Sequence, residues 1–359
     1  MKKIDVDITK AATLQREFYA SKDNFNNTLE KIFSRNWQFI TDDYQLKENR
    51  SSFPFQFLGD LLPEPLVFIN NKGTINCFSN VCTHRGNILI NEPCTINKLI
   101  TCGYHGKQFD TCGKFKFMPK TERMQNFPSR QDDLPEVAVA KWRQFIFSSL
   151  DPAIEFNKLI KDVEERVGWM PIEDFKYRED LSKDYYVKAS WALYCDNYLE
   201  GFHIPFVHAD LNAVLDFNSY DVETFKYSNL QLGIASDDDI CFDLPIESKD
   251  YGRKIAAYYF WLFPNLMLNF YPWGLSVNII TPISVNETKV QFKSYVWDES
   301  RLDSGVGADL DKVELEDEQI VQQVQKGVAS RFYKQGRFSP TMEKGVHHFH
   351  SLISDFMNK

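Results

Sequence analysis

Four residues with metal-binding side chains stand in two short motifs of this sequence. Cys82 and His84 form a Cys-x-His pair, and Cys102 and His105 form a Cys-x-x-His pair. A glycine closes each motif, in CTHRG and in CGYHG. Two thiolates and two imidazoles can hold a [2Fe–2S] cluster, with the cysteines on one iron and the histidines on the other. Because imidazoles are neutral, such a cluster has a raised potential and suits an electron relay.

A structural zinc site is the alternative for the same four residues. Zinc fingers usually pair cysteine with cysteine in one arm and histidine with histidine in the other. Here each arm supplies one residue of each type, which favours a cluster held between two hairpin tips.

Two histidines form a second candidate site, in the segment CDNYLEGFHIPFVH. Pro205 lies between His203 and His208. Because a residue that precedes proline avoids the helical conformation, we expect a helix to end near His203 and the chain to turn. His208 can then return towards His203, and the two imidazoles could bind one metal. The alternative is a pair of ordinary histidines, one that caps a helix and one that is buried.

A carboxylate on an apolar helix face provides the third ligand candidate. Residues 309–328 are predicted to form a long amphipathic helix, and at 100° per residue Asp317 falls within its apolar stripe. Glu316 and Glu318 point to either side, and Glu314 lies at the margin. The stripe comprises Leu310, Val313, Ile320, Val321, Val324 and Val328. A carboxylate in such a place needs a partner, which is either a bound cation or a lysine or arginine.

Two histidines and one carboxylate form the facial triad of non-haem Fe(II) oxygenases, in which other coordination positions stay open for O₂ and substrate. Such a site needs electrons one at a time, and the cluster predicted for the first motif would deliver them. The two candidate sites therefore support each other.

The elements that position these residues fall into three segments. Residues 8–36 are expected to be helical, and short β-rich runs separated by turn signals follow them. Helix is again predicted over 189–203, and antiparallel strands over 256–297. Asp237, Asp238 and Asp239 are expected to form a solvated loop. The expected domains are 1–37, 38–150 and 151–359.

Composition excludes several classes of protein. The chain has 359 residues, enough for two cores, with a net charge of −9 and no long basic cluster, which argues against nucleic-acid binding. No signal peptide and no membrane-spanning stretch are expected. Seven scattered cysteines suit a reducing compartment, so we expect a cytoplasmic protein.

The cysteine and histidine motifs resemble those of the Rieske family. They depart from its pattern at Gly103, where proline is common, and at Lys107, where tryptophan is common, so the packing around the cluster is expected to differ. Asn197-x-x-Glu200-x-x-His203, His208 and Glu316-Asp317 extend the resemblance to the α subunit of Rieske non-haem iron oxygenases. The C-terminal segments 336–340 and 347–350 are also similar to that family, and the resemblance covers residues 35 to 353.

This resemblance implies an α+β protein with an N-terminal all-β Rieske domain and a C-terminal helix-grip (START-like) catalytic domain around an antiparallel sheet. It implies a [2Fe–2S] cluster on Cys82, His84, Cys102 and His105, and a mononuclear Fe(II). It carries the iron ligands over to His203, His208 and Asp317. A separate reductase, with flavin and an iron–sulfur centre, would supply electrons from NAD(P)H.

In this family an acidic residue three positions before the first iron histidine bridges to a Rieske histidine of the neighbouring subunit. That residue is Glu200 here, and a helix surface residue is the alternative. The bridge requires a ring of subunits, so a homotrimer is expected. Asn197 and Asp196 could orient the iron ligands.

A glutamate at position 200 resembles the branch that acts on carnitine, choline and related quaternary amines. The aromatic residues Trp261, Phe270, Tyr271 and Trp273 could line a cation-binding pocket or form core. The favoured function is therefore hydroxylation or N-demethylation of a small quaternary amine. The alternatives are an aromatic-ring dihydroxylating dioxygenase, a Rieske electron carrier with a non-catalytic second domain, and a binding protein with a degenerate metal site. His347, His348 and His350 are expected to serve packing or surface roles.

Overall fold

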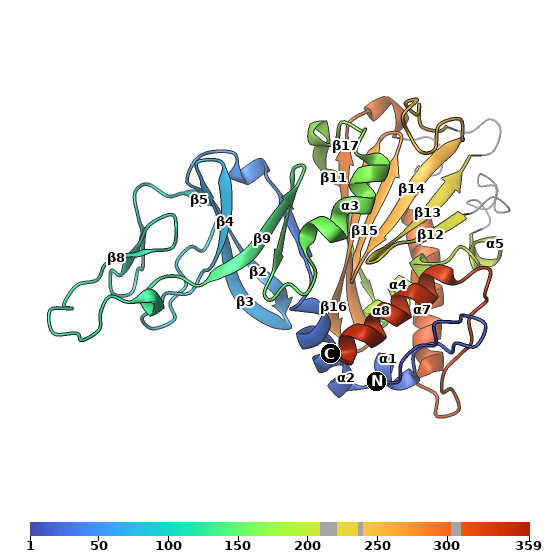
Figure 1. The fold of residues 1–359 in the computed structure, drawn as a ribbon, viewed down its shortest axis with the longest axis horizontal. Helices are drawn as coiled ribbons and strands as arrows, with labels where there is room; N and C mark the ends of the chain where they lie inside the picture. The colour runs from blue at the N-terminus through green and yellow to red at the C-terminus, as the bar shows by residue number, and fades with distance from the viewer. Residues whose placement is uncertain (209–220, 236–239, 303–309) are drawn as a thin grey trace. The chain divides into compact units, whose positions relative to one another are not determined.

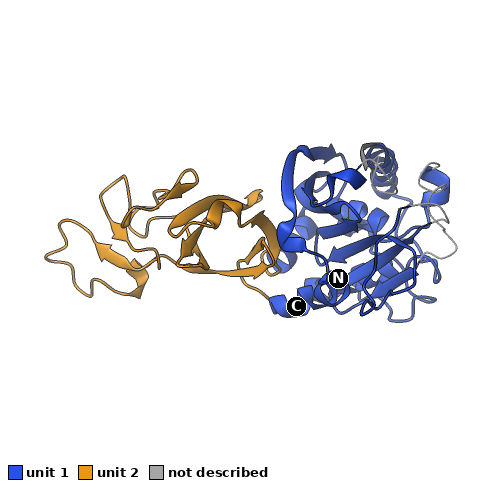
Figure 2. Ribbon diagram, turned by 90° about the horizontal axis from the view of Figure 1, so that it is seen from above, with its two compact units in different colours: residues 1–33, 154–359 blue, residues 34–153 orange. Residues whose placement is uncertain are grey.

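The computed structural model describes residues 1–208, 221–235, 240–302 and 310–359, without the side chains of residues 310 and 311. The described residues form two compact units, one from Met1–Phe33 with Ile154–Lys359 and the other from Ser34–Ala153 (Figure 2). The expected boundaries after residues 37 and 150 lie close to these limits, and the division into three domains stays a prediction.

The unit Ser34–Ala153 is built from strands, as its β-rich runs indicate (Figure 1). A seven-stranded antiparallel sheet has the order β1-β10-β9-β4-β3-β2-β5, and a three-stranded sheet has the order β6-β7-β8. The bounds are β1 Gln38–Asp42, β2 Ser51–Asp60, β3 Leu62–Asn71, β4 Thr74–Ser79, β5 Cys94–Thr95, β6 Ile100–Thr101, β7 Gln108–Phe109, β8 Phe115–Phe117, β9 Glu136–Trp142 and β10 Phe145–Ser149. Short 3-10 turns lie at Tyr44–Leu46 and Arg130–Asp132.

The β3–β4 hairpin illustrates how local sequence sets this sheet. Asn71 pairs with Thr74, and the two residues between them, Lys72 and Gly73, both have positive φ (55° and 91°). This is the two-residue turn whose twist matches that of the flanking strands. The hairpin fixes the register that buries Val67 and Ile69 of β3.

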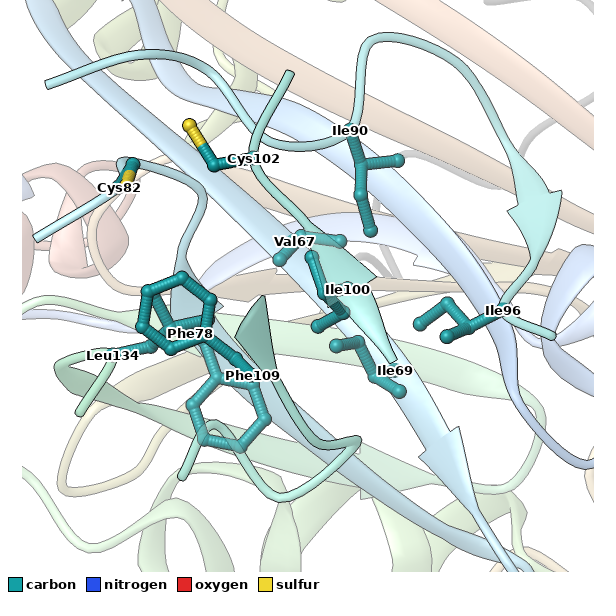
Figure 3. Packing of buried hydrophobic residues seen from close by; sticks show 10 residues of the cluster. All are labelled: Val67, Ile69, Phe78, Cys82, Ile90, Ile96, Ile100, Cys102, Phe109 and Leu134. Atoms are coloured by element: carbon teal, nitrogen blue, oxygen red, sulfur yellow. The ribbon is translucent and has the colours of Figure 1, made fainter. Parts of the chain in front are cut away.

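An apolar cluster joins the two sheets of this unit (Figure 3). Val67, Ile69 and Phe78 of the large sheet pack with Ile100 and Phe109 of the small one. The two motif cysteines belong to the same cluster and lie together at one end of it (Figure 3). The core of the unit therefore positions the loops that begin at these cysteines.

The larger unit contains a second seven-stranded antiparallel sheet, in the order β11-β17-β16-β15-β14-β13-β12 (Figure 1). Its strands are β11 Lys176–Val187, β12 Asp221–Thr224, β13 Ser228–Ile234, β14 Ile255–Leu262, β15 Leu266–Tyr271, β16 Gly274–Ser284 and β17 Glu287–Val296. The antiparallel strands predicted for 256–297 are thus confirmed, and Ser284 pairs with Glu287 across the turn that joins β16 and β17.

The larger unit also contains helices. They are α1 Arg16–Ala20, α2 Lys22–Thr28, the π-helix η1 Leu29–Phe33, α3 Phe156–Val167, α4 Trp191–Tyr198, α5 Ile204–Val207, α7 Leu310–Val328 and α8 Lys344–Met357. Short 3-10 turns lie at Ile172–Asp174 and Glu299–Arg301. Helix α4 packs against both β16 and α7, and α8 packs against β12 and η1. No described helix combines the length and apolarity needed to cross a membrane.

The N-terminal segment departs from the expected helix. Residues 8–15 are not helical, because their backbone groups bond elsewhere: the Asp7 carboxylate accepts the Thr9 N–H at 3.1 Å, and the Thr13 N–H donates to the Gly336 carbonyl at 3.1 Å. The helical prediction is therefore wrong before Arg16 and after Phe33, and between these residues it is correct except at Ser21, where the backbone is extended.

Aromatic packing fixes the position of α4. Trp191, in its first turn, contacts Phe33 of η1 and Phe349 of α8 at ring-centroid distances of 5.0 and 5.7 Å. Trp261 of β14 contacts Phe349 at 5.1 Å. Trp261 and Phe270 are both fully buried and do not line the cavity described below, so these two aromatics belong to the core.

Candidate metal centres

Three ligand atoms of the predicted triad lie together in the larger unit. His203, His208 and Asp317 each offer one donor atom, and these atoms all lie within 4.8 Å of one another. The Asp317 Oδ1 atom is 3.4 Å from His203 Nε2 and 3.0 Å from His208 Nε2. Donors about 2.1 Å from one first-row metal and at right angles to each other are ~3 Å apart, so these distances fit a shared ion.

The chain turns earlier than the sequence suggested. The predicted helix 189–203 is wrong at its end, because α4 ends at Tyr198 and His203 is the residue before α5. The cause is the Glu200 side chain, whose Oε2 atom accepts the backbone N–H groups of Phe202 and His203. This carboxylate competes with helical hydrogen bonding and starts a new turn. Pro205 then lies in the first turn of α5, where its missing N–H costs nothing.

Two further carboxylates orient the imidazoles. Glu200 Oε1 lies 2.7 Å from His203 Nδ1, and Glu316 Oε2 lies 2.7 Å from His208 Nδ1. Each Nδ1–H therefore has an acceptor, which leaves both Nε2 atoms to face Asp317. Carboxylates in this position fix the tautomer and the ring orientation of metal-binding histidines.

Asn197 holds the third ligand in place. Its Nδ2 donates to Asp317 Oδ1 at 2.6 Å, from the last turn of α4 to the middle of α7. Asp196, expected in a similar role, makes no hydrogen bond or ion pair with His203, His208 or Asp317 in the described part of the chain. It lies 2.8 Å from His350 Nε2 and accepts the Tyr19 hydroxyl at 2.9 Å, so that expectation is wrong.

The pKa shifts reflect the closeness of these groups. Burial lowers the pKa of His203, but hydrogen bonds with Asp317 and Glu200 outweigh burial and raise it to about 9. Burial raises the pKa of Asp317, but hydrogen bonds with the two histidines outweigh burial and lower it to about 2. The three groups thus share positive charge among them, either as protons or as a metal cation. Two imidazoles and one carboxylate are the donor set of a non-haem Fe(II) facial triad.

Helix α7 is rotated relative to the predicted stripe. Glu314, expected at the margin, is only 3% exposed, whereas Ile320 and Val324, expected in the stripe, are 36% and 44% exposed. Val321 and Val328 are buried as expected. Periodicity assigned the apolar residues to the core, but α7 lines the site with Glu314 and Asp317 beside Val313.

The triad lines a cavity of about 120 Å³. One water needs ~10–15 Å³ on this measure, so the space admits a small organic molecule. The other lining side chains are aromatic, amide, apolar or acidic: Tyr194, Asn197, Tyr198, Glu200, Ile204, Gln231, Tyr259, Asn269, Tyr271, Asn278, Phe292, Val313 and Glu314.

Of the four aromatics considered from sequence, one lines the cavity. Tyr271 does so, Trp273 stacks on it with ring centroids 5.2 Å apart, and Tyr259 meets it edge-on at 5.9 Å. Sequence reasoning missed Tyr194 on α4, Glu314 on α7 and the other lining residues on strands β13 to β17. The strand register and the packing of α4 on α7 and β16 bring these residues together, and no local pattern signals either.

The C-terminal histidines make structural contacts. His350 is 1% exposed, and its Nδ1 accepts the Leu14 N–H at 3.2 Å. His348 Nδ1 lies 2.8 Å from Asn229 Oδ1, and burial lowers the pKa of His348 to about 4. The acidic run at 237–239 lies outside the described residues.

The Cys/His loops of the smaller unit share one backbone design. The Cys82 N–H donates to the Asn87 carbonyl and the Cys102 N–H to the Lys107 carbonyl, each at 2.8 Å. Gly86 and Gly106 donate back to the carbonyls of these cysteines, each at 3.0 Å, with φ of 71° and 73°. Glycine adopts this left-handed conformation without strain.

The four side chains of these loops are arranged in two layers. Cys82 and Cys102 are both 2% exposed and lie in the same apolar cluster. His84 and His105 are exposed, and their rings lie 4.8 Å apart. Paired thiols inside and paired imidazoles outside fit a [2Fe–2S] cluster with two different irons.

The two departures from the Rieske pattern have different structural effects. A Cβ at Gly103 would meet no atom within 4 Å, so glycine is not required there by packing. Lys107 is 1% exposed and pairs with Asp132 at 3.1 Å. Its ammonium group lies 5.3 to 5.9 Å from the rings of Phe109, Phe115 and Phe127.

Comparisons with known proteins follow the same division of the chain. The family model for the ring hydroxylating alpha subunit (catalytic domain) matches residues 169–359, more than half of the chain. The model for the Rieske [2Fe-2S] domain matches residues 36–128.

Curated relatives span nearly the whole chain. Choline monooxygenase (chloroplastic) of Beta vulgaris is 29% identical over 363 residues, which cover 96% of this chain and 77% of that protein. The carnitine monooxygenase oxygenase subunit of Escherichia coli (strain K12) is 26% identical over 361 residues, covering 96% and 94%.

Solved structures share the fold. A quaternary ammonium Rieske monooxygenase in complex with L-carnitine has a TM-score of 0.76 at 22% identity and covers 99% of both chains. Naphthalene 1,2-dioxygenase with indole bound has a TM-score of 0.71 at 18% identity, covering 100% of this chain and 95% of that one.

Proposed function

The chain belongs to the family of ring hydroxylating alpha subunits and carries a Rieske [2Fe-2S] domain, and on this premise we propose that it oxidises a small quaternary amine. The motif resemblance is thereby confirmed, and the chain is an oxidoreductase, the terminal oxygenase component of a Rieske system. The observation that carries the proposal is the triad of His203, His208 and Asp317 in the wall of an acidic, tyrosine-lined cavity.

In this proposal two sets of residues hold the two metal groups. Cys82, Cys102, His84 and His105 hold the cluster, and the triad holds a ferrous ion. Bound there, Fe(II) would activate O₂ for insertion into a substrate C–H bond, with two electrons and two protons reducing the second oxygen atom to water. The electrons come from NAD(P)H through a separate reductase with flavin and an iron–sulfur centre.

The residues around the triad keep it ready for this reaction. Glu200 and Glu316 hold the Nδ1 protons, so both histidines present Nε2 to the metal. Asn197 restrains the Asp317 carboxylate through its 2.6 Å hydrogen bond. Pre-oriented ligands of this kind need no rearrangement during turnover.

Glu200 is proposed to connect His203 with a Rieske histidine of a neighbouring copy. The position of Glu200 supports this role. Glu200 lines the triad cavity and also a second depression, which it forms with Asp196, Val324 and His350. A hydrogen-bonded carboxylate there would give electrons a path to His203. Head-to-tail contacts of this type close into a ring, so we expect a homotrimer.

Glu200→Gln tests the bridge. Because Glu200 also accepts the Nδ1 proton of His203, the variant is loaded with saturating Fe(II) and compared with the wild type at equal iron and cluster content. It should then lose most substrate-dependent O₂ uptake, and turnover at the wild-type rate would exclude the role. Mass measurement in solution tests the trimer, since a monomeric, fully active enzyme would contradict it.

Substrate-coupled O₂ uptake tests the function itself. The holoenzyme, with a flavin and iron–sulfur reductase and NAD(P)H, is offered choline, carnitine, betaines and simple arenes. We expect coupled uptake with at least one quaternary amine. Uptake coupled only to arenes would support the dioxygenase alternative, and no coupled uptake would support an electron carrier or a binding protein.

A further inference from the structure

Glu314 is a buried carboxylate that the proposed metal chemistry does not use. It lies on α7 one turn before Asp317, lines the cavity and is 3% exposed. The Tyr194 hydroxyl donates to its Oε2. Its Oε1 is buried and has no hydrogen-bond partner among the described residues. Buried polar atoms in native proteins nearly always have a partner, so a ligand in the cavity is the natural candidate.

The other acidic groups of the cavity wall already have partners. Both oxygens of Glu200 accept hydrogen bonds from the segment that carries His203. Asp317 faces the two imidazoles and Asn197. Glu314 is therefore the acidic side chain in this wall that remains to balance a charge on a ligand.

In the described part of the wall, positive charge is confined to the triad. The described residues that line the cavity include no lysine and no arginine. Segments 209–220, 236–239 and 303–309 contain no lysine, arginine or histidine in their sequence, so they cannot supply a cationic side chain either. Away from the triad, an anionic group on a ligand would therefore meet carboxylates in this cavity without a counter-charge, which is unfavourable at low dielectric.

The tyrosines of the wall favour the same type of ligand. The Tyr198 hydroxyl donates to Asn269 Oδ1 at 2.6 Å, and the Tyr194 hydroxyl is bound to Glu314. With their polar ends occupied inside the protein, these residues contribute mainly aromatic surface, which attracts quaternary ammonium groups.

We infer that Glu314 is the counter-charge for the ammonium group of the substrate, and that the substrate is a cation without a carboxylate of its own. The inference rests on the proposed oxidation of a quaternary amine. It narrows the substrate class to ammonium cations with no second charged group, such as amino alcohols. Zwitterions such as betaines and carnitine are disfavoured, because the cationic partner that the wall offers their carboxylate is the proposed triad metal, whose open positions are needed for O₂. Burial raises the pKa of Glu314 to about 8, and a nearby cation would lower that pKa, so the carboxyl ionises as the cation binds.

Ligand binding, measured without turnover, tests this assignment. The iron-loaded protein is titrated by calorimetry without O₂ or reductase, using choline, its neutral isostere 3,3-dimethylbutanol, glycine betaine and carnitine. Choline should bind at least about tenfold more tightly than any of the other three. Equal or tighter binding of the zwitterions would overturn the inference, and this comparison needs no variant.

Glu314→Gln provides the second test. It keeps the size of the side chain and an oxygen acceptor for Tyr194. The variant should bind choline at least about tenfold more weakly and 3,3-dimethylbutanol as the wild type does. Glu318→Gln, which removes the same charge from the same helix outside the cavity wall, should leave both affinities unchanged. Unchanged choline binding in Glu314→Gln would overturn the role of Glu314.

The two proposals can fail separately. Uptake of O₂ coupled to carnitine, together with carnitine affinity that does not depend on Glu314, would leave the quaternary-amine function intact and overturn the inference. Arene-coupled uptake with no binding of any cation would overturn both.

Discussion

Glu316→Gln should weaken the binding of iron while leaving the three proposed ligands in place. In the wild type the Glu316 carboxylate accepts the Nδ1–H of His208 at 2.7 Å. His208 is 1% exposed, so no water can readily take over this role. Glutamine can still accept one hydrogen bond, but it loses the negative charge that makes His208 a stronger ligand, and its amide can also flip and present N–H to the ring.

The expected magnitude follows from the exposure of Glu316. Loss of a hydrogen-bonded partner behind a metal ligand typically costs 10–100-fold in metal affinity, or about 1.4–2.7 kcal/mol. The Glu316 side chain is 32% exposed, so solvent screens its charge. We therefore expect the lower end of this range, about a tenfold weaker Fe(II) affinity.

Anaerobic competition against a chelator measures this affinity, and the visible spectrum of the cluster reports whether the smaller unit is intact. Glu318→Gln is the matched control, because Glu318 makes no hydrogen bond or ion pair with either histidine in the described structure. An affinity unchanged in Glu316→Gln, or lowered equally in Glu318→Gln, would refute the reasoning that Glu316 acts through His208.

Three further outcomes are expected. Against the effect of burial, hydrogen bonds raise the pKa of His203 to about 9 and also raise the pKa of His208, and both imidazoles must be neutral to bind metal. Fe(II) affinity should therefore fall by at least about tenfold per pH unit below pH 9, and a flat profile from pH 7 to 9 would contradict this. Lys107→Met should lower the free energy of unfolding by about 3 kcal/mol, since it leaves the poorly exposed Asp132 carboxylate without its ion-pair partner. Lys114→Met, in an exposed pair, should lower it by less than about 1 kcal/mol. Denaturant titrations measure both values. Gly345→Ala should lower the free energy of unfolding by about 1–3 kcal/mol and should also lower the iron occupancy. Its Cβ would lie 2.3 Å from the Leu199 carbonyl oxygen, in the segment that leads to His203. Gly327→Ala, whose Cβ would meet no atom within 4 Å, should change neither stability nor iron occupancy.

The sequence allowed the chemistry of both sites to be predicted, because residue type and short spacing carry it. The two Cys/His motifs predicted a pair of similar loops, and the structure gives both loops the same backbone hydrogen bonds. The position of Asp317 in an otherwise apolar stripe predicted a carboxylate that needs a partner, and the structure places it beside His203 and His208.

What could not be predicted depends on contacts between distant segments. Periodicity placed Glu314 at the margin of α7 and Ile320 in the core, but the helix is set by its packing on α4, which buries the first and exposes the second. Glu316 has no local signature, since its role arises only where α7 meets the residue after α5. The end of α4 was misplaced because a single side chain, Glu200, takes the backbone N–H groups that would extend a helix.

Iron content is the most direct test of a cluster and a separate ferrous site in one chain. Wild-type protein loaded anaerobically should contain about three irons and two acid-labile sulfides per chain, and Asp317→Ala about two irons with an unchanged cluster spectrum. Two irons in both proteins, or three in both, would contradict the account, because the third iron would then be absent or held by other residues.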